Sequence, residues 1–502
     1  MTTRSTPLER RLLLLVLGLG LWLCATMPVF AQEAYYWCYA QHPALSYFDH
    51  PPMVAWTIRL GTELLGDGAL GLRLFTFLFG FGTSWLGAVW LRQLGLDPWV
   101  RCGWIVCSIG MPLLLVLHFL ATPDPPLVFF WTLSMVALRR AREGSFGWWL
   151  AAGAAAGCAL LGKYAAAFLA VGGLIVLIGD PKMRAQWKRP GLYAGVLAAC
   201  AVFLPVILWN LGNDFESFRF QTEGRWSKGR FGAHWIVQFL AGQLGVMHPV
   251  VAILIPASTL WILRRAFRRD EAAVWLAAFG LPMPLFFLGN SLFIQVKINW
   301  LLPNFLPLSA GVLWWWLETG KRAARPESTR RLAKIVLWTG LVAAAVAPVI
   351  RVWPQIGGSS WAGWDRFAER ARHWAGHLRE RSGDPSRNFY FASSYRDSAQ
   401  LLRSLKLLGE ERGQRGLPVV LSQNVFGQRA LEFDHWEAPQ DHVGADAIFV
   451  LPRPGERPTE VEKLKAHFDS VQQVERVRVE FLAWTVADAA IFEARGYRGP
   501  GG

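Results

Sequence analysis

The sequence is poor in cysteine and in charge. Only six of its 502 residues are cysteine, and only 17% are Asp, Glu, Lys or Arg. The cysteines form no Cys-X-X-Cys pair and avoid the last 300 residues, occurring at Cys24, Cys38, Cys102, Cys107, Cys158 and Cys200. This pattern suggests neither a disulfide framework nor a zinc site. Internal repeats and low-complexity segments are also missing from the chain.

Apolar and aromatic residues, in contrast, are abundant. Hydrophobic residues make up 53% of the chain, with 27 Trp and 32 Phe, which is more than a soluble protein of this size normally has. The net charge of +15 comes from one region, because residues 1–351 hold 31 Lys and Arg against 16 Asp and Glu, whereas residues 352–502 hold 20 of each. The excess positive charge therefore belongs to the loops of a membrane protein and does not indicate a nucleic-acid partner.

Apolar runs that could cross a bilayer recur through residues 1–351. A membrane helix needs about 20 apolar residues, and the expected spans are 11–30, 71–91, 102–121, 125–138, 147–162, 164–179, 191–211, 235–263, 272–289, 299–317 and 332–350. With the N-terminus in the cytoplasm, 22 Lys and Arg lie in inside segments and eight in outside segments, as the positive-inside rule requires. About 11 membrane helices and an exported tail follow. A cleaved signal peptide is the less favoured interpretation of the first run.

The tail, residues 352–502, has the pattern of a small soluble α/β domain. Short strands are predicted at 388–391, 419–421 and 447–450, and amphipathic helices at 398–408 and 460–468 could pack on the resulting sheet. The predicted fold class is an α-helical polytopic membrane protein with a C-terminal α/β domain, divided into residues 1–351 and 352–502. No catalytic motif stands out in the tail.

The loop at 31–73 carries the strongest candidates for chemistry. It is expected to hold two helical pieces on the outer membrane surface, an aromatic one at 33–41 and another that begins after Pro51-Pro52. Glu33 and Asp49 lie in this loop, and Asp124 at the outer end of the third span can face it. Charge at mid-bilayer costs on the order of 2.5 to 3.5 kcal/mol, so carboxylates here call for an explanation. One of them could act as general base on an acceptor hydroxyl.

Cations in other outward segments could neutralise a departing phosphate. These residues are Lys163, Arg225 and Lys228. Each candidate also fits a structural role, since Asp49 and Asp124 could favour helix N-termini, Lys163 could reach the membrane surface, and the two later cations could lie in a solvated loop. Asp49 and His50 could bind a metal together, although a lone Asp-His pair fits a hydrogen-bonding role better.

Several segments resemble the family 39 glycosyltransferases of the GT-C fold. This family includes protein O-mannosyltransferases and transferases that add aminoarabinose or related sugars to lipid A. The matching segments are EAYYW at 33–37, YFDHPPMVAW at 47–56, GLRL at 71–74, TPDPPL at 122–127, GKY at 162–164 and NWLLP at 299–303. The similarity extends over roughly residues 30 to 320.

The resemblance implies an enzyme of the bacterial inner membrane. It would move a hexose or pentose from a polyprenyl-phosphate donor, such as undecaprenyl phosphate, to a periplasmic acceptor by direct displacement with inversion. The acceptor expected is a glycolipid such as lipid A or lipopolysaccharide, with a protein as the other choice. Membrane lipids are also expected as partners, and nucleic acid is not. The resemblance settles no cofactor and leaves a divalent metal open.

The resemblance also suggests roles for individual residues. The family motif usually opens with an Asp-Glu pair, but Gln32 occupies the Asp position, so the base remains a choice among Glu33, Asp49 and Asp124. The residues expected at the donor phosphate are His50, Lys163 and Tyr164 from the matching segments, together with Arg225 and Lys228 from their outward position. The residues expected to line the substrate cavity are Tyr36, Tyr47, Asn299 and Trp300.

Two other functions remain open. A membrane transporter or lipid flippase would also have many spans and broken helices, although outward clustering of charge and the lack of an inverted repeat favour the enzyme. A scaffold without activity would explain the change at Gln32.

Overall fold

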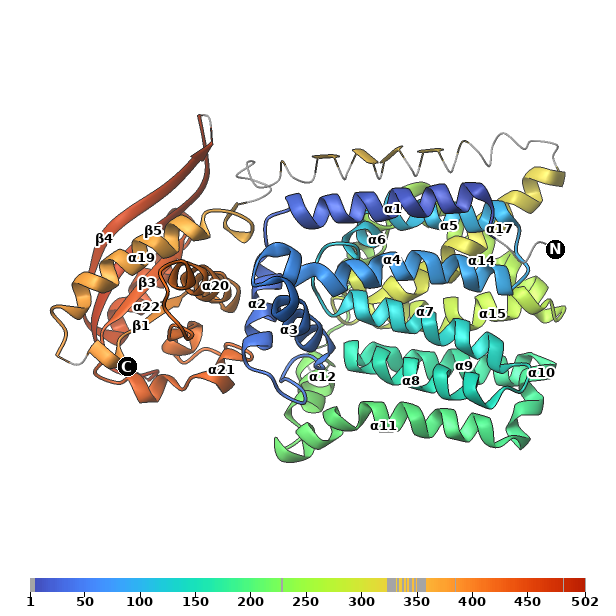
Figure 1. The fold of residues 1–502 in the computed structure, drawn as a ribbon, viewed down its shortest axis with the longest axis horizontal. Coiled ribbons are helices and arrows are strands. Elements are labelled where there is room, and N and C mark those ends of the chain that lie inside the picture. The colour runs from blue at the N-terminus through green and yellow to red at the C-terminus, as the bar shows by residue number, and fades with distance from the viewer. Residues whose placement is uncertain are drawn as a thin grey trace. The chain divides into compact units, whose positions relative to one another are not determined.

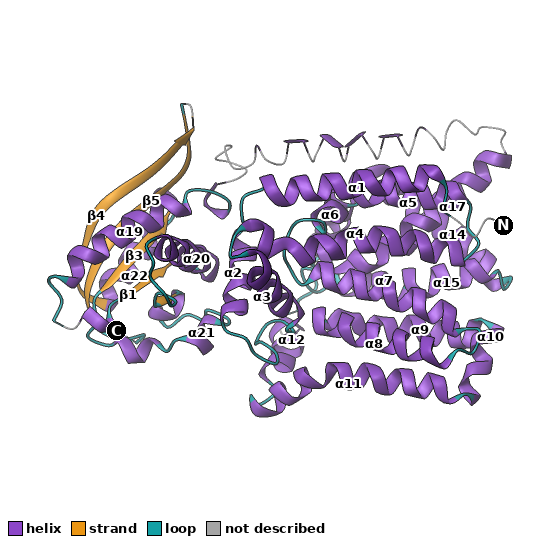
Figure 2. Cartoon of the chain, in the orientation of Figure 1, coloured by secondary structure: helices purple, strands orange, loops and turns teal. Residues whose placement is uncertain are grey.

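The computed structural model describes residues 5–226, 229–322 and 358–501, apart from 384 and 482, together with scattered positions between 331 and 349. The chain divides into two compact units. Unit 1 comprises Met1–Ala25, Leu45–Thr57 and Arg73–Ala345, and unit 2 comprises Thr26–Ala44, Ile58–Leu72 and Val346–Gly502. The described part of unit 1 is helical, whereas unit 2 combines helices with a sheet (Figure 2). The boundary predicted at residue 351 lies outside the described residues, and both units share the loop at 31–73.

Unit 1 is a set of helices that run side by side (Figure 1). Its first helices are α1 (Pro7–Thr26), α4 (Ala69–Gln93), α5 (Pro98–Gly110), α6 (Pro112–Val116), α7 (Asp124–Ala141) and α8 (Phe146–Gly162). They are followed by η1 (Tyr164–Ala167), α9 (Phe168–Gly179), α10 (Pro181–Arg184), η2 (Ala185–Lys188), α11 (Pro190–Gly212) and α12 (Glu216–Trp226). The last are α13 (Ala233–Val246), α14 (Pro249–Phe267), α15 (Glu271–Gly280), α16 (Pro282–Asn290), η3 (Ile298–Asn304) and α17 (Phe305–Arg322).

The polytopic helical fold is confirmed, but the predicted number of eleven spans is not. Among the described residues, four helices are long and apolar enough to cross a membrane, or up to six if each bent pair is one span. Several predicted runs are interrupted. The run 102–121 is divided between α5 and α6, and the run 235–263 is broken at His248, whose φ is +73°. The predicted span 332–350 lies largely outside the described residues.

Small residues bring α8 against both of its neighbours, α7 and α11. A Cβ atom on Gly153 would lie 1.8 Å from the carbonyl oxygen of Gly195 on α11, so this approach requires glycine. At the other end of α8, a Cβ on Gly162 would lie 3.0 Å from the backbone nitrogen of Leu127 on α7. This packing places the end of α8 beside the beginning of α7.

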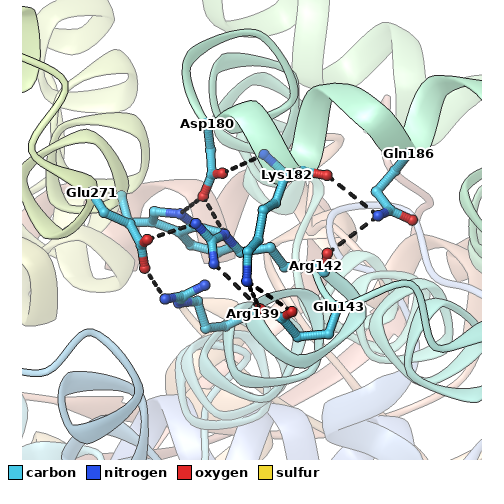
Figure 3. Close-up of polar contacts among 8 residues, drawn as sticks. Arg139, Arg142, Glu143, Asp180, Lys182, Gln186 and Glu271 are labelled. Carbon is cyan, nitrogen blue, oxygen red and sulfur yellow. Dashed lines mark hydrogen bonds and ion pairs between the residues drawn. The ribbon is translucent and has the colours of Figure 1, made fainter.

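An ion-pair network holds the C-terminal end of α7 (Figure 3). Arg142 donates from Nε to Asp180 at 2.6 Å and from Nη2 to Glu271 at 2.6 Å, while the Trp275 indole donates to Asp180 at 3.0 Å. Further contacts join Arg139 to Glu271, Lys182 to Glu143 and Gln186 to the carbonyl of Arg142. Burial alone would raise the pKa of Asp180, but the hydrogen bonds from Arg142 and Trp275 together hold it below its usual range.

Unit 2 contains a five-stranded sheet with helices around it. Its helical elements are α2 (Ala31–Gln41), η5 (Gly358–Ser360), α19 (Trp364–Arg379), η6 (Pro385–Arg387), α20 (Tyr395–Glu411), η7 (Gln423–Phe426), α21 (Phe433–Trp436), η8 (Pro439–His442), η9 (Pro454–Glu456) and α22 (Pro458–His467). Its strands are β1 (Phe389–Ala392), β2 (Val420–Leu421), β3 (Ala447–Pro452), β4 (Phe468–Phe481) and β5 (Trp484–Tyr497), in the order β2-β1-β3-β5-β4.

The three predicted strands correspond to β1, β2 and β3, and the α/β character of the tail is confirmed. These strands are parallel, with Tyr390 opposite both Val420 and Ile448. The predicted helices correspond to α20 and α22. The prediction did not include the antiparallel hairpin of β4 and β5, which extends the sheet beyond β3.

Both helices predicted in the loop at 31–73 are present, as α2 and as α3 (Met53–Leu65). The expectation that α2 exposes its aromatic residues at a membrane surface needs correction, because Tyr35, Trp37 and Tyr39 are fully buried. The ring of Tyr35 lies 4.7 Å from that of Tyr395 on α20, and the Trp37 indole donates to Asp67 at 2.6 Å. The aromatic residues of α2 therefore form part of the interior of unit 2.

Candidate functional site

Asp124 begins α7 in unit 1 and is almost fully buried. Two prolines follow it, and proline suits the first turn of a helix because the backbone N–H groups there have no partner within the helix. Lys163 donates from Nζ to one carboxylate oxygen at 2.9 Å, and the Asn299 side-chain amide donates to the other at 2.7 Å. Both oxygens of this carboxylate are therefore engaged.

The three residues of this cluster come from distant parts of the sequence. Lys163 is the extended residue between α8 and η1, and the packing of Gly162 on α7 brings it to Asp124. Asn299 lies in η3, which packs against α7. We predicted a role for each residue from a different short segment, and the structure brings all three side chains into contact.

A cavity of 180 Å³ opens beside Lys163. One part of its lining is polar and consists of His50, Lys163, Tyr164 and Gln221. The other part is aromatic and consists of Phe168, Phe286, Phe287 and Trp300. The Phe287 and Trp300 rings are 5.0 Å apart. The cavity thus offers cationic and hydrogen-bonding groups together with an apolar wall, an arrangement that suits an amphiphilic ligand.

The segment 47–50 forms a tight turn that directs His50 into this cavity. The backbone nitrogen of Tyr47 donates to the carbonyl of His50 at 3.2 Å, and Gln221 on α12 donates to the carbonyl of Asp49 at 2.8 Å. Tyr47, the first residue of the turn, is fully buried. The Asp49 carboxylate lies 3.9 Å from His50 Nε2, which is too long for a hydrogen bond but close enough for electrostatic attraction.

The helix α12 supplies site residues that the sequence analysis missed. Ser217 forms a 2.7 Å hydrogen bond with the Tyr164 hydroxyl, and Gln221 lines the cavity four residues later. Positions i and i+4 share one face of a helix. That spacing of two polar residues among Phe215, Phe218 and Phe220 was the signal available in the sequence. The aromatic pair of Phe286 and Phe287 was also missed.

Glu33, Gln32 and Tyr36 belong to unit 2, on α2. The Glu33 carboxylate accepts from the backbone nitrogen of Phe30 at 2.9 Å, as an acidic residue in the first turn commonly does. Gln32 accepts from the Arg396 guanidinium at 3.1 Å. Tyr36 is buried, with its ring 5.5 Å from that of Tyr39. These contacts give Glu33 a structural task at the start of α2.

Two predicted phosphate ligands cannot be placed. Lys228 and the side chain of Arg225 lie outside the described residues. Within the part of the chain that the structure describes, no group of three or more His, Cys, Asp and Glu residues could hold a metal ion.

The fold is shared with a protein whose crystal structure is known. The chain is similar to ArnT from Cupriavidus metallidurans in the apo state, with a TM-score of 0.63 and 16% identity over 96% of this chain and 97% of that chain. The same protein bound to undecaprenyl phosphate gives a TM-score of 0.58 and 17% identity over the same shares. This similarity confirms the predicted fold class.

The sequence adds a match to glycosyltransferases. Residues 49–209 match the family described as dolichyl-phosphate-mannose-protein mannosyltransferase, a segment that contains Asp49, His50, Asp124, Lys163 and Tyr164. The chain is 28% identical over 316 residues to the lipid A galacturonosyltransferase RgtD of Rhizobium johnstonii, covering 60% of this chain and 64% of the relative.

A second relative comes from Pseudomonas fluorescens. It is the undecaprenyl phosphate-alpha-4-amino-4-deoxy-L-arabinose arabinosyl transferase 1, which is 28% identical over 299 residues, covering 56% of this chain and 51% of the relative. The alignments thus span about half to two thirds of these relatives. The resemblance predicted from the loop at 31–73 and its companion segments is confirmed.

Proposed function

We propose that the chain is a membrane glycosyltransferase that moves a sugar from undecaprenyl phosphate to a glycolipid acceptor such as lipid A. The observation that carries this proposal is the cavity with His50 and Lys163 on one side and Phe286, Phe287 and Trp300 on the other. A lipid phosphate combines the same two properties, an anionic group and an apolar chain. The names of the two relatives support the donor and the acceptor.

In this proposal Lys163 and its neighbours bind the donor phosphate. An ammonium group has three donors, and Asp124 accepts one of them. The others remain available to phosphate oxygens, supported by His50, Tyr164 and Gln221 around the same cavity. Asp124 and Asn299 then act as positioning groups, because the carboxylate fixes the direction in which Lys163 presents its charge.

We assign Asp49 the role of general base toward the acceptor hydroxyl. Asp124 already binds two donors, and Glu33 caps α2, whereas Asp49 directly precedes the cavity residue His50. The acceptor hydroxyl oxygen would attack the anomeric carbon, and its proton would pass to Asp49. The bond from that carbon to the phosphate oxygen breaks, and undecaprenyl phosphate leaves with the bonding electrons. A single displacement inverts the anomeric configuration.

We also propose that the Asp124 end of α7 faces the periplasm of a bacterial inner membrane. The helix has 18 residues, so its ends are about 27 Å apart at 1.5 Å per residue. The opposite end carries Arg139, Arg140 and Arg142, and such residues accumulate on the cytoplasmic side.

A reconstituted transfer assay tests this function. Purified protein in lipid nanodiscs would receive lipid A and either of two labelled donors, undecaprenyl phosphate carrying galacturonic acid or 4-amino-4-deoxy-L-arabinose. We expect labelled lipid A with one donor, identified by mass spectrometry, and at least a 100-fold loss in Asp49→Asn. The matched control is Asp97→Asn, a partly exposed helix cap on α5.

Two outcomes would contradict the proposal. Movement of the labelled lipid between leaflets of a liposome, without transfer, would support a flippase. Full transfer by Asp49→Asn would be consistent with a transferase but would show that Asp49 is not its base.

A further inference from the structure

Unit 2 contains a second polar cavity, of 170 Å³, that the proposed transferase does not use. Its lining includes Arg372 and Arg379 of α19, Tyr390 of β1, Lys406 of α20 and Arg415 from the following loop. Four of its eleven lining residues are cationic, and none is acidic. The C-terminal segment around the cavity lacks a comparable excess, since residues 352–502 hold equal numbers of acidic and basic residues. The basic lining is therefore a local concentration of charge.

Regular structure explains why these side chains converge. Arg372 and Arg379 are seven residues apart on α19, which places them two turns apart on one face. Phe389 and Phe391 lie in the hydrophobic core of the sheet, so Tyr390 between them points to the opposite face. Tyr390 is buried there, with its ring at the cavity.

The loop that carries Arg415 has a defined turn. The backbone nitrogen of Gln414 donates to the carbonyl of Gly409, and that of Gly413 donates to the carbonyl of Glu410, both at 2.9 Å. Gly413 has φ +72°, and this combination is the Schellman motif that ends many helices. The Gln414 side chain in turn accepts from the Arg372 guanidinium. The turn thus holds Arg372 through Gln414 and places Arg415 in the cavity lining.

The charges in this cavity are only partly neutralised. Lys406 forms an ion pair with Glu410 at 2.5 Å, one turn along α20. Among the described residues, Arg372, Arg379 and Arg415 have no carboxylate within ion-pair distance. Burial raises the pKa of Tyr390, while Arg379 and Arg372 oppose that shift, so its hydroxyl stays protonated at neutral pH.

We propose that this cavity binds a phosphoryl group, carried by a phosphorylated glycolipid or by free phosphate. Guanidinium groups present paired donors that match phosphate oxygens, and three of them surround the cavity together with a tyrosine hydroxyl. Pockets for drug-sized ligands begin at about 300 Å³. A cavity of 170 Å³ therefore suits one phosphoryl group, not a complete glycolipid.

Phosphate binding by the full-length protein tests this site without any sugar donor, so its result does not depend on the proposed transferase activity. The protein in detergent micelles and phosphate-free buffer would be titrated with inorganic phosphate, followed by calorimetry. We expect at least ten-fold weaker binding in Arg379→Gln/Arg415→Gln. The matched control is Arg412→Gln, an exposed residue of the same loop that does not line the cavity.

A competition experiment distinguishes the two sources of phosphate. Displacement by bisphosphorylated lipid A, but not by its dephosphorylated form, would identify a glycolipid ligand. Arginine-dependent binding without such displacement would identify free phosphate. Arg415→Gln alone, in an exposed turn, provides a second variant if the double variant fails to fold. The absence of phosphate binding, or equal affinity in wild type and both cavity variants, would overturn the proposal.

Discussion

The charged residues at the two ends of α7 differ in what surrounds them. At its C-terminal end, Arg142 is surrounded by Asp180 and Glu271, and the network is closed by further ion pairs. At its N-terminal end, Asp124 forms an ion pair with Lys163, and that lysine also lines a cavity. A buried charge whose partners are all protein groups holds helices together, whereas one that also faces open space can bind a ligand.

The largest expected effect is at the cavity end. Lys163→Gln removes the cation that faces the proposed phosphate, and loss of one such donor typically lowers the rate about 100- to 1000-fold. The transfer assay measures this loss per folded protein. Because the substitution also leaves Asp124 without its cation, Asp124→Asn/Lys163→Gln serves as the companion variant. It should regain thermal stability without regaining transfer. Near-normal transfer by Lys163→Gln would place the phosphate elsewhere.

At the network end we expect the reverse, a loss of stability with little loss of transfer. Arg142→Gln leaves Asp180 buried without its cation, which costs about 3 kcal/mol of unfolding free energy. Thermal denaturation in nanodiscs measures the change, and transfer per folded molecule should stay within about two-fold of wild type. Lys182→Gln is the matched control, since its ion pair with Glu143 is largely exposed and contributes less than about 1 kcal/mol.

The network should also respond to pH in one direction. Asp180 has a pKa below its usual range when folded, so its stabilising effect is complete above the unfolded value of about 3.9 and disappears as pH falls through the folded value. The difference in melting temperature between wild type and Asp180→Asn should therefore be constant above about pH 5 and shrink below about pH 4. A difference that grows on acidification would show that the carboxyl is protonated in the native network.

Sequence patterns predicted the residues at the N-terminal end of α7 better than the ion-pair network at its C-terminal end. Short segments with proline or glycine beside a charge pointed to Asp124, Lys163 and Asn299, whose side chains meet. The basic residues at the other end were read only as a sign of membrane topology. Their acidic partners Asp180 and Glu271 lie 38 and 129 residues beyond Arg142. No local pattern can report such pairings.

The same limit explains the two main differences in the fold. Apolar length does not reveal where a helix breaks, so the run 102–121 was expected to be one span although it is divided between α5 and α6. The aromatic residues of α2 led to the prediction of a segment at the membrane surface. Their burial could not be predicted, because Tyr395, which packs on Tyr35, lies 360 residues later in the chain. Strands β1 to β3, in contrast, were visible in the sequence because each is a short apolar run.

Glu33 provides a third kind of buried carboxylate, and the smallest expected effect. It accepts from the backbone nitrogen of Phe30, and Glu33→Gln keeps an oxygen in the same position for this bond. We therefore expect a stability loss of no more than about 1 kcal/mol, the typical worth of a helix cap, and transfer within about three-fold of wild type. Glu33→Ala, which removes the acceptor, should lower stability further. If Glu33→Gln folds normally but loses transfer by 100-fold or more, the carboxylate charge is needed for the reaction. Glu33 would then replace Asp49 as the proposed base.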